Sequence, residues 1–117
     1  MISAVLRIDY WLVAQVEITQ AEPEPGRRVL AVSGEFDLAV ADRLQLAFEE
    51  AGESLELHLD LSECKFIDST VIALFVRTRE KRAEEGRGFV LLGAEGQVLR
   101  VLELTGLAEN GLVPDAG

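Results

Sequence analysis

The stretch of residues 59–74 constrains the fold more than any other part of the chain. An apolar strand pattern ends near Leu61, a short loop follows, and Asp68-Ser69-Thr70 opens a strongly hydrophobic segment that is typical of a helix. At a helix start, side chains meet unpaired backbone N–H groups and the positive end of the helix dipole. We therefore expect a phosphate on a hydroxyl at this position to be well accommodated.

Strand and helix patterns alternate along the rest of the chain. They predict strands at 13–19, 29–33, 55–61 and 89–92, and helices at 38–51, 69–85 and 97–105. The turn signal of residues 23–26 makes the first two strands a hairpin. A hairpin followed by strand–helix–strand order indicates an α/β domain with a mixed sheet, and 117 residues suffice for one core. A weak strand signal also occurs at Leu112-Val113.

The apolar residues of these segments predict which faces are buried. The helix at 38–51 has one apolar stripe, the strand at 55–61 has leucines on one face, and the helix at 97–105 has a short apolar side. In chain order these residues are Val40, Leu44, Ala47, Phe48 and Ala51; Leu55, Leu57, Leu59 and Leu61; and Val98, Val101 and Leu102.

The charge balance excludes several classes of function. Twenty-one acidic and eleven basic residues give a net charge of −10, which disfavours binding to nucleic acid. No stretch is long and apolar enough for membrane insertion, and Arg7 and Asp9 interrupt residues 1–14 where an export signal needs an unbroken apolar run. The single cysteine, Cys64, allows no intrachain disulfide and favours the cytoplasm.

Motifs for cofactors, metals and catalysis are lacking in the sequence. The only histidine, His58, alternates with leucines on a strand and is interpreted as structural, so we expect no metal site and no cofactor. Ser69 has neither a histidine partner at a plausible spacing nor a Gly-x-Ser-x-Gly elbow, so we expect no enzyme activity. From local chemistry alone, Asp68, Ser69 and Thr70 are better explained as helix-capping residues than as a functional site.

The first two turns of the second helix have no polar side. Burial of this half under neighbouring elements explains the pattern, and so does an exposed apolar ridge beside Ser69 that would mark a partner site. Both can hold together. The residues in question include Val71, Ile72 and Phe75.

Three stretches, taken together, resemble the bacterial anti-sigma factor antagonists, a family within the STAS domains. One resembles the family's Gly-Glu-Leu-Asp loop, one its strand, loop and phosphoacceptor segment, and one its third helix. These stretches are Gly34-Glu35-Phe36-Asp37, residues 60–70 and residues 98–107. The resemblance places a STAS domain at 13–113, an N-terminal extension or extra strand at 1–12, and a tail at 114–117. It implies a mixed sheet of about four to five strands with helices mainly on one face.

The resemblance also implies a function in transcription regulation. In this family the unmodified protein binds an anti-sigma factor that is a serine kinase, the kinase phosphorylates the serine after the aspartate, and a phosphatase acting on the phosphoserine resets the switch. The acceptor here would be Ser69, or alternatively Thr70. The partner-binding residues would be Asp37, Asp68, Ser69, Thr70, Val71, Ile72 and Phe75.

Three points stay open at this level. Many family members have Asp-Ser-Ser-Gly where this chain has Asp68-Ser69-Thr70-Val71, so a β-branched residue replaces a glycine near the acceptor. The alternative function is a STAS subunit that is not phosphorylated and serves a transporter or a stress-sensing scaffold. The sequence does not fix the oligomeric state, and a homodimer is one of the alternatives.

Overall fold

The computed structural model describes residues 3–11, as backbone, and residues 16–107. The predicted signals at 13–15, at Leu112-Val113 and in the tail lie outside these residues. The elements are β1 (Ser3–Trp11), β2 (Val16–Glu24), β3 (Arg27–Phe36), α1 (Leu38–Glu50), β4 (Glu56–Ile67), α2 (Ser69–Glu84), β5 (Gly88–Leu92) and α3 (Gly96–Leu104).

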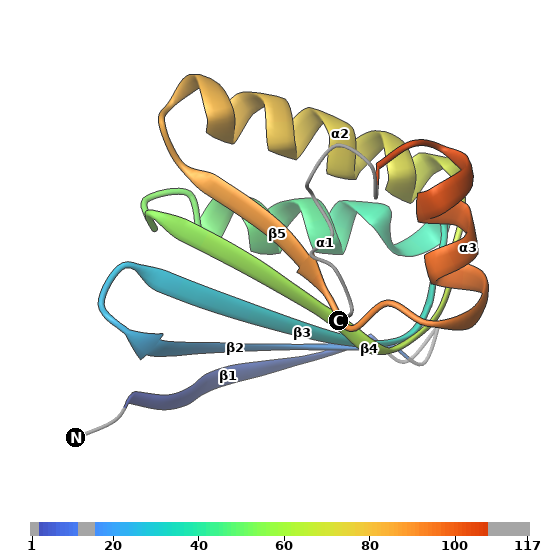
Figure 1. The fold of residues 1–117 in the computed structure, drawn as a ribbon. Coiled ribbons are helices and arrows are strands. Elements are labelled where there is room, and N and C mark those ends of the chain that lie inside the picture. Colours follow the sequence, from blue (N-terminus) through green and yellow to red (C-terminus); the bar gives the residue numbers. More distant parts are fainter. Residues whose placement is uncertain (1–2, 12–15, 108–117) are drawn as a thin grey trace.

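The five strands form one mixed sheet in chain order. β1, β2 and β3 pair antiparallel, whereas β3, β4 and β5 pair parallel. Helices α1 and α2 lie side by side over one face of the sheet, and α3 stands at the end where β4 finishes (Figure 1). The fold class is therefore confirmed: a single α/β domain with a mixed sheet and helices mainly on one face.

The core lies between the sheet and the helices, and most of the predicted apolar faces point into it. The whole predicted stripe of α1 is buried, as are Leu57, Leu59 and Leu61 of β4. The rings of Phe48, Phe75 and Phe89 join α1, α2 and β5, with centroids 5.4–6.4 Å apart. Leu55 was predicted to share the buried face of this strand, but it is 63% exposed, because β4 begins only at the next residue.

Strand β4 is longer than the sequence predicted, because residues 62–67 continue the strand where a loop was expected. Two β-bulges explain the difference, since at two places β4 has one residue more than β3 between successive pairs. Each bulge shifts the inward positions, so Leu61, Cys64 and Ile67 are all buried at a spacing of three. The pairs that flank the bulges are Ala31 with Asp60, Ser33 with Glu63, Gly34 with Cys64, and Glu35 with Phe66.

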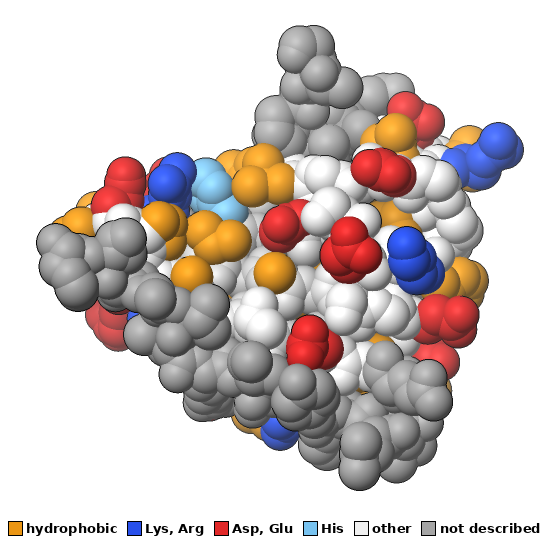
Figure 2. Space-filling view, turned by 90° about the horizontal axis from the view of Figure 1, so that it is seen from below, with side chains coloured by type: hydrophobic (Ala, Val, Ile, Leu, Met, Phe, Trp, Pro, Cys, Tyr) orange, Lys and Arg blue, Asp and Glu red, His pale blue; other side chains and the backbone are white. Residues whose placement is uncertain are grey.

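No helix among the described elements covers the opposite face of the sheet. Figure 2 shows this face from below, with small apolar side chains, carboxylates and the single histidine spread over it. His58 lies here because Leu57 and Leu59 on either side of it point into the core. Its Nε2 atom lies 3.2 Å from a carboxylate oxygen of Glu56.

Candidate functional site

Two aspartates follow the ends of two neighbouring parallel strands. Phe36, the last residue of β3, pairs with Ile67, the last residue of β4. Asp37 and Asp68 come next, and each is the N-cap of the helix that follows. The carboxyl ends of parallel strands are where open α/β sheets usually place their binding sites. Sheet pairing thus brings together the two aspartates that the sequence singled out.

The carboxylate of Asp68 binds the starts of two helices. Its Oδ1 atom accepts hydrogen bonds from the backbone N–H groups of Thr70, at 3.0 Å, and Val71, at 3.1 Å. Its Oδ2 atom accepts one from the N–H of Leu38, the first residue of α1, at 3.0 Å. Asp37 makes a simpler cap, in which its Oδ1 atom accepts from the N–H of Ala39 at 2.9 Å. Both aspartates therefore have a structural task beside any contact with a partner.

Ser69 is the first residue of α2 and is exposed. Its hydroxyl forms no hydrogen bond with the described part of the chain. Thr70, the alternative acceptor, is half-buried. Of the two neighbouring hydroxyls, that of Ser69 is the more accessible to another protein, and the fold places it next to the start of α1.

The apolar residues after Ser69, for which the sequence allowed an exposed ridge, divide into two buried residues and one that is half-buried. Val71 and Phe75 are buried, each with 0% exposure, so their side chains pack in the core and offer no surface to a partner. This placement differs from the expectation that they would contact a partner, and it follows from the packing of α2 onto the sheet. Ile72 is half-buried and lies one turn after Ser69 on the same side of α2. The glycine-to-valine difference at position 71 therefore falls on a side chain that is buried in the core.

Two exposed apolar residues near Ser69 were missed by the sequence reasoning. Leu38 is 71% exposed and is joined to Asp68 through its backbone N–H. Phe66 is 38% exposed and lies three residues before Ser69, on the outward side of the bulged part of β4. The position of Leu38, directly after a capping residue and off the apolar stripe of α1, was the signal that could have identified it. Phe66 gave no such signal, because its direction depends on the bulges.

Gln97 was also missed, and it fixes α3 against the end of β4. Its side-chain Nε2 donates to the carbonyl oxygen of Ile67 at 3.1 Å, and its Oε1 accepts from the N–H of Ile67 at 3.2 Å. The side chain thus pairs with this backbone residue in the way a neighbouring strand would. Ile67 directly precedes Asp68 and Ser69, so Gln97 positions the segment that presents them.

Neither a reactive thiol nor a metal-binding cluster adds to the candidate site around Ser69 in the described residues. Burial raises the pKa of the Cys64 thiol to about 11, which keeps the side chain protonated and unreactive at neutral pH. Within residues 16–107, no three His, Cys, Asp or Glu side chains gather in a way that could hold a metal ion. In the same part of the chain, none of the helices has the length and apolar composition needed to cross a bilayer.

Comparison with known proteins agrees with this geometry. A family model described as "Mlab, STAS domain" matches residues 19–114. The anti-sigma-B factor antagonist of Listeria monocytogenes is 31% identical over 80 residues, which are 67% of this chain and 70% of that protein, and the Listeria innocua protein of the same name gives the same values.

Solved structures show the same fold. An anti-sigma factor antagonist from Mycobacterium paratuberculosis superimposes with a TM-score of 0.74 at 29% identity, over 86% of this chain and 87% of that one. The unphosphorylated form of the anti-sigma factor antagonist SpoIIAA gives a TM-score of 0.73 over 86% and 88% of the two chains, and its 16% identity is a likeness of fold. The chain belongs to the STAS-domain family, among the anti-sigma factor antagonists.

Proposed function

We propose that this protein, a regulatory binding protein and not an enzyme, binds an anti-sigma factor serine kinase in the cytoplasm and is switched off when Ser69 is phosphorylated. The observation that carries the proposal is the exposed hydroxyl of Ser69 at the start of α2, which is unbonded among the described residues and lies beside two capping aspartates. A kinase can reach such a hydroxyl without unfolding the domain. Binding of the unmodified protein to the anti-sigma factor would free the sigma factor for transcription, and phosphorylation of Ser69 would end this release.

The proposed contact surface surrounds Ser69. It consists of the polar groups of Asp37, Asp68 and Thr70 with an apolar rim formed by Leu38, Phe66 and Ile72. Exposed apolar side chains next to polar groups are the usual composition of a protein interface. Val71 and Phe75 would support this surface from the core rather than touch the partner.

The phosphate would act chiefly on the complex. It adds about −1.5 to −2 charges at neutral pH to a chain that already has a net charge of −10. Asp68 already accepts from the N–H groups of Thr70 and Val71, so a phosphate on Ser69 would have to displace a carboxylate to reach those two donors. Its charge would instead face the partner. A hundredfold loss of affinity needs only about 2.7 kcal/mol, which a poorly solvated phosphate can supply.

The relatives support this reading in two ways. The curated relatives are named anti-sigma-B factor antagonists, at 31% identity. The Bacillus protein SpoIIAA, which shares the fold with a TM-score of 0.68, has been solved in its phosphorylated form. A domain of this shape can thus hold a phosphate and remain folded.

The test compares Ser69 variants as baits in the native host. We expect the tagged wild-type protein and Ser69→Ala to co-purify an anti-sigma factor kinase, and Ser69→Asp to lose it, as measured by quantitative mass spectrometry. The purified kinase with ATP should phosphorylate the wild-type protein and Thr70→Ala but not Ser69→Ala. A phosphatase acting on phosphoserine should restore binding.

Two results would count against the proposal. Phosphorylation of Ser69→Ala but not of Thr70→Ala would move the switch to Thr70. Recovery of transporter or scaffold subunits, in equal amounts with Ser69→Ala and Ser69→Asp, would assign the chain to the alternative class of STAS subunits that are not phosphorylated.

A further inference from the structure

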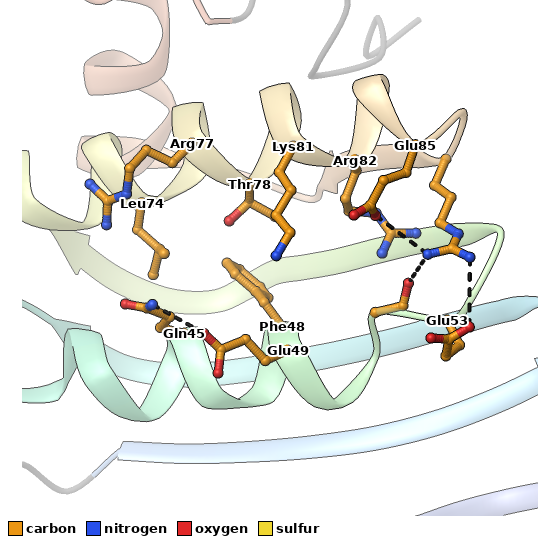
Figure 3. A pocket seen from close by; sticks show the side chains of 12 residues that line it. Gln45, Phe48, Glu49, Glu53, Leu74, Arg77, Thr78, Lys81, Arg82 and Glu85 are labelled. Carbon is orange, nitrogen blue, oxygen red and sulfur yellow. Dashed lines mark hydrogen bonds and ion pairs between the residues drawn. The ribbon is translucent and has the colours of Figure 1, made fainter.

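A groove lies between the carboxyl-terminal halves of α1 and α2, away from Ser69. Its volume is about 520 Å³, within the range of small-molecule sites. The floor is apolar, since Phe48 of α1 and Leu74 of α2 meet there and are 5% and 4% exposed. Figure 3 shows the groove with these two side chains between the helices.

Two cations on α2 line this groove. Arg77 and Lys81 are one helical turn apart, and neither side chain forms an ion pair or a hydrogen bond with the described residues. In Figure 3 the Lys81 side chain extends from α2 toward the Phe48 ring, and Arg77 extends toward α1 beside Leu74. Like charges at this spacing repel each other, so an anion between them would remove an unfavourable interaction.

The far end of the groove is held by two further arginines. Arg82 is buried, with 4% exposure, and its guanidinium donates to the carbonyl oxygens of Ser54, at 2.6 Å, and Gly88, at 2.8 Å. Arg87 donates to the carbonyl of Gly52 at 2.7 Å, and ion pairs join it to Glu53 and Glu85. These contacts connect α2 and the turn that follows it to the loop after α1 and to the start of β5, so this end of the groove is held in place.

The lining is more positive than the protein as a whole. Four cations and three carboxylates line the groove of a chain with a net charge of −10. Two of the carboxylates, Glu53 and Glu85, are paired with Arg87. The third, Glu49, accepts a hydrogen bond from Gln45 and faces the groove from α1. Glu49 thus faces two cations, Arg77 and Lys81, that form no ion pair with the described residues. These three groups leave an excess of one positive charge, which favours an occupant with a single negative charge.

We propose that the groove binds a small organic acid with one negative charge and an apolar body. The acid group lies between Arg77 and Lys81, and the body covers Phe48 and Leu74. Charge-assisted contacts fix the head group, and burial of apolar surface supplies the remaining affinity. The site is independent of Ser69, so it does not rest on the phosphoswitch.

The test uses 1-anilinonaphthalene-8-sulfonate, an aromatic monoanion, as the probe. We expect saturable binding of one equivalent to the full chain by fluorescence and calorimetry. The double substitution Arg77→Gln/Lys81→Gln should weaken the affinity about tenfold or more. Binding of neutral N-phenyl-1-naphthylamine should change little in the same variant, since it lacks the acid group.

The matched control is Arg79→Gln/Arg100→Gln, which removes the same charge from residues that do not line the groove. It should bind the anion as the wild type does. Equal weakening in both double variants would show a general charge effect and overturn the proposal. Absence of saturable binding to the wild type would do the same, as would amide chemical-shift changes that fall outside α1 and α2.

Discussion

Asp68 and Leu38 are joined by a hydrogen bond of 3.0 Å across thirty positions of sequence, in which the backbone N–H of Leu38 donates to the second carboxylate oxygen of Asp68. The first oxygen caps α2. One side chain therefore couples the starts of α1 and α2 at the place where the phosphoacceptor is presented. Removal of this carboxylate affects two helices, whereas removal of an ordinary cap affects one.

Asp68→Ala should lower the free energy of unfolding by about 2–3 kcal/mol, because three N–H groups lose a charged acceptor. Asp37→Ala, which removes a single cap bond, should cost about 1 kcal/mol. Urea denaturation of both variants measures the difference. Equal losses would show that the bond between Asp68 and Leu38 contributes nothing to stability.

Ser69→Ala should leave stability within about 0.5 kcal/mol of the wild type, because the hydroxyl is exposed and has no bonding partner among the described residues. Thermal denaturation provides the measurement. This result is needed to interpret the binding experiments, since loss of a partner in a Ser69 variant must not reflect unfolding. A loss of more than about 1 kcal/mol would give Ser69 a structural role.

Val71→Gly restores the residue that many family members have, yet it should destabilise this protein by about 3 kcal/mol. The change removes a buried side chain, worth about 1.5–3 kcal/mol, and adds the cost of glycine in a helix, about 1 kcal/mol. Ala73→Gly, at an exposed position two residues later, should show only the helix cost. Similar losses in urea denaturation for both variants would contradict a core role for Val71.

Gln97→Ala should weaken the attachment of α3 to β4. Loss of the two bonds to Ile67 is expected to cost about 1–2 kcal/mol of stability. The specific readout is hydrogen exchange of the Ile67 amide, which should become faster as its acceptor is removed. Gln45→Ala serves as the control, because the Gln45 amide bonds only to an exposed carboxylate one turn away. Unchanged exchange at Ile67 would contradict the positioning role of Gln97.

The stability of the fold should decrease above pH 9 because of Cys64. Burial raises the pKa of its thiol from the ordinary value of 9.0 to about 11, so the cysteine of the unfolded chain loses its proton at a lower pH than that of the folded chain. Between these values the unfolded state binds fewer protons than the folded state, so stability falls as pH rises, by about 2–3 kcal/mol in total.

Cys64→Ala has no thiol to ionise, so the stability difference between the wild type and this variant should shrink as pH rises from neutral to about 10. Urea denaturation of both proteins across this range tests the effect. A difference independent of pH would show that the thiol is not kept protonated by the fold. At neutral pH, a thiol reagent should modify the wild type only as fast as it unfolds.

Patterns local in sequence identified the phosphoacceptor segment but not its surroundings. The caps at Asp37 and Asp68 and the hydrophobic run after Ser69 were readable from a few adjacent residues, and the structure starts both helices there. The direction of each side chain was harder to predict. Val71 and Phe75 could not be told from an exposed ridge, because a helix that is apolar all round does not reveal which part other elements cover.

The sequence by itself determined the order of strands and helices, where helices begin, and the family, because periodicity and capping depend on neighbouring residues. The tertiary structure decided which distant residues meet. The pairing of β3 with β4 brings Asp68 to Leu38, and two bulges turn Cys64 inward. The packing of α1 on α2 places Arg77 and Lys81 at a groove with an apolar floor. These relationships depend on the register of a sheet and the contact of two helices, which no single stretch of sequence specifies.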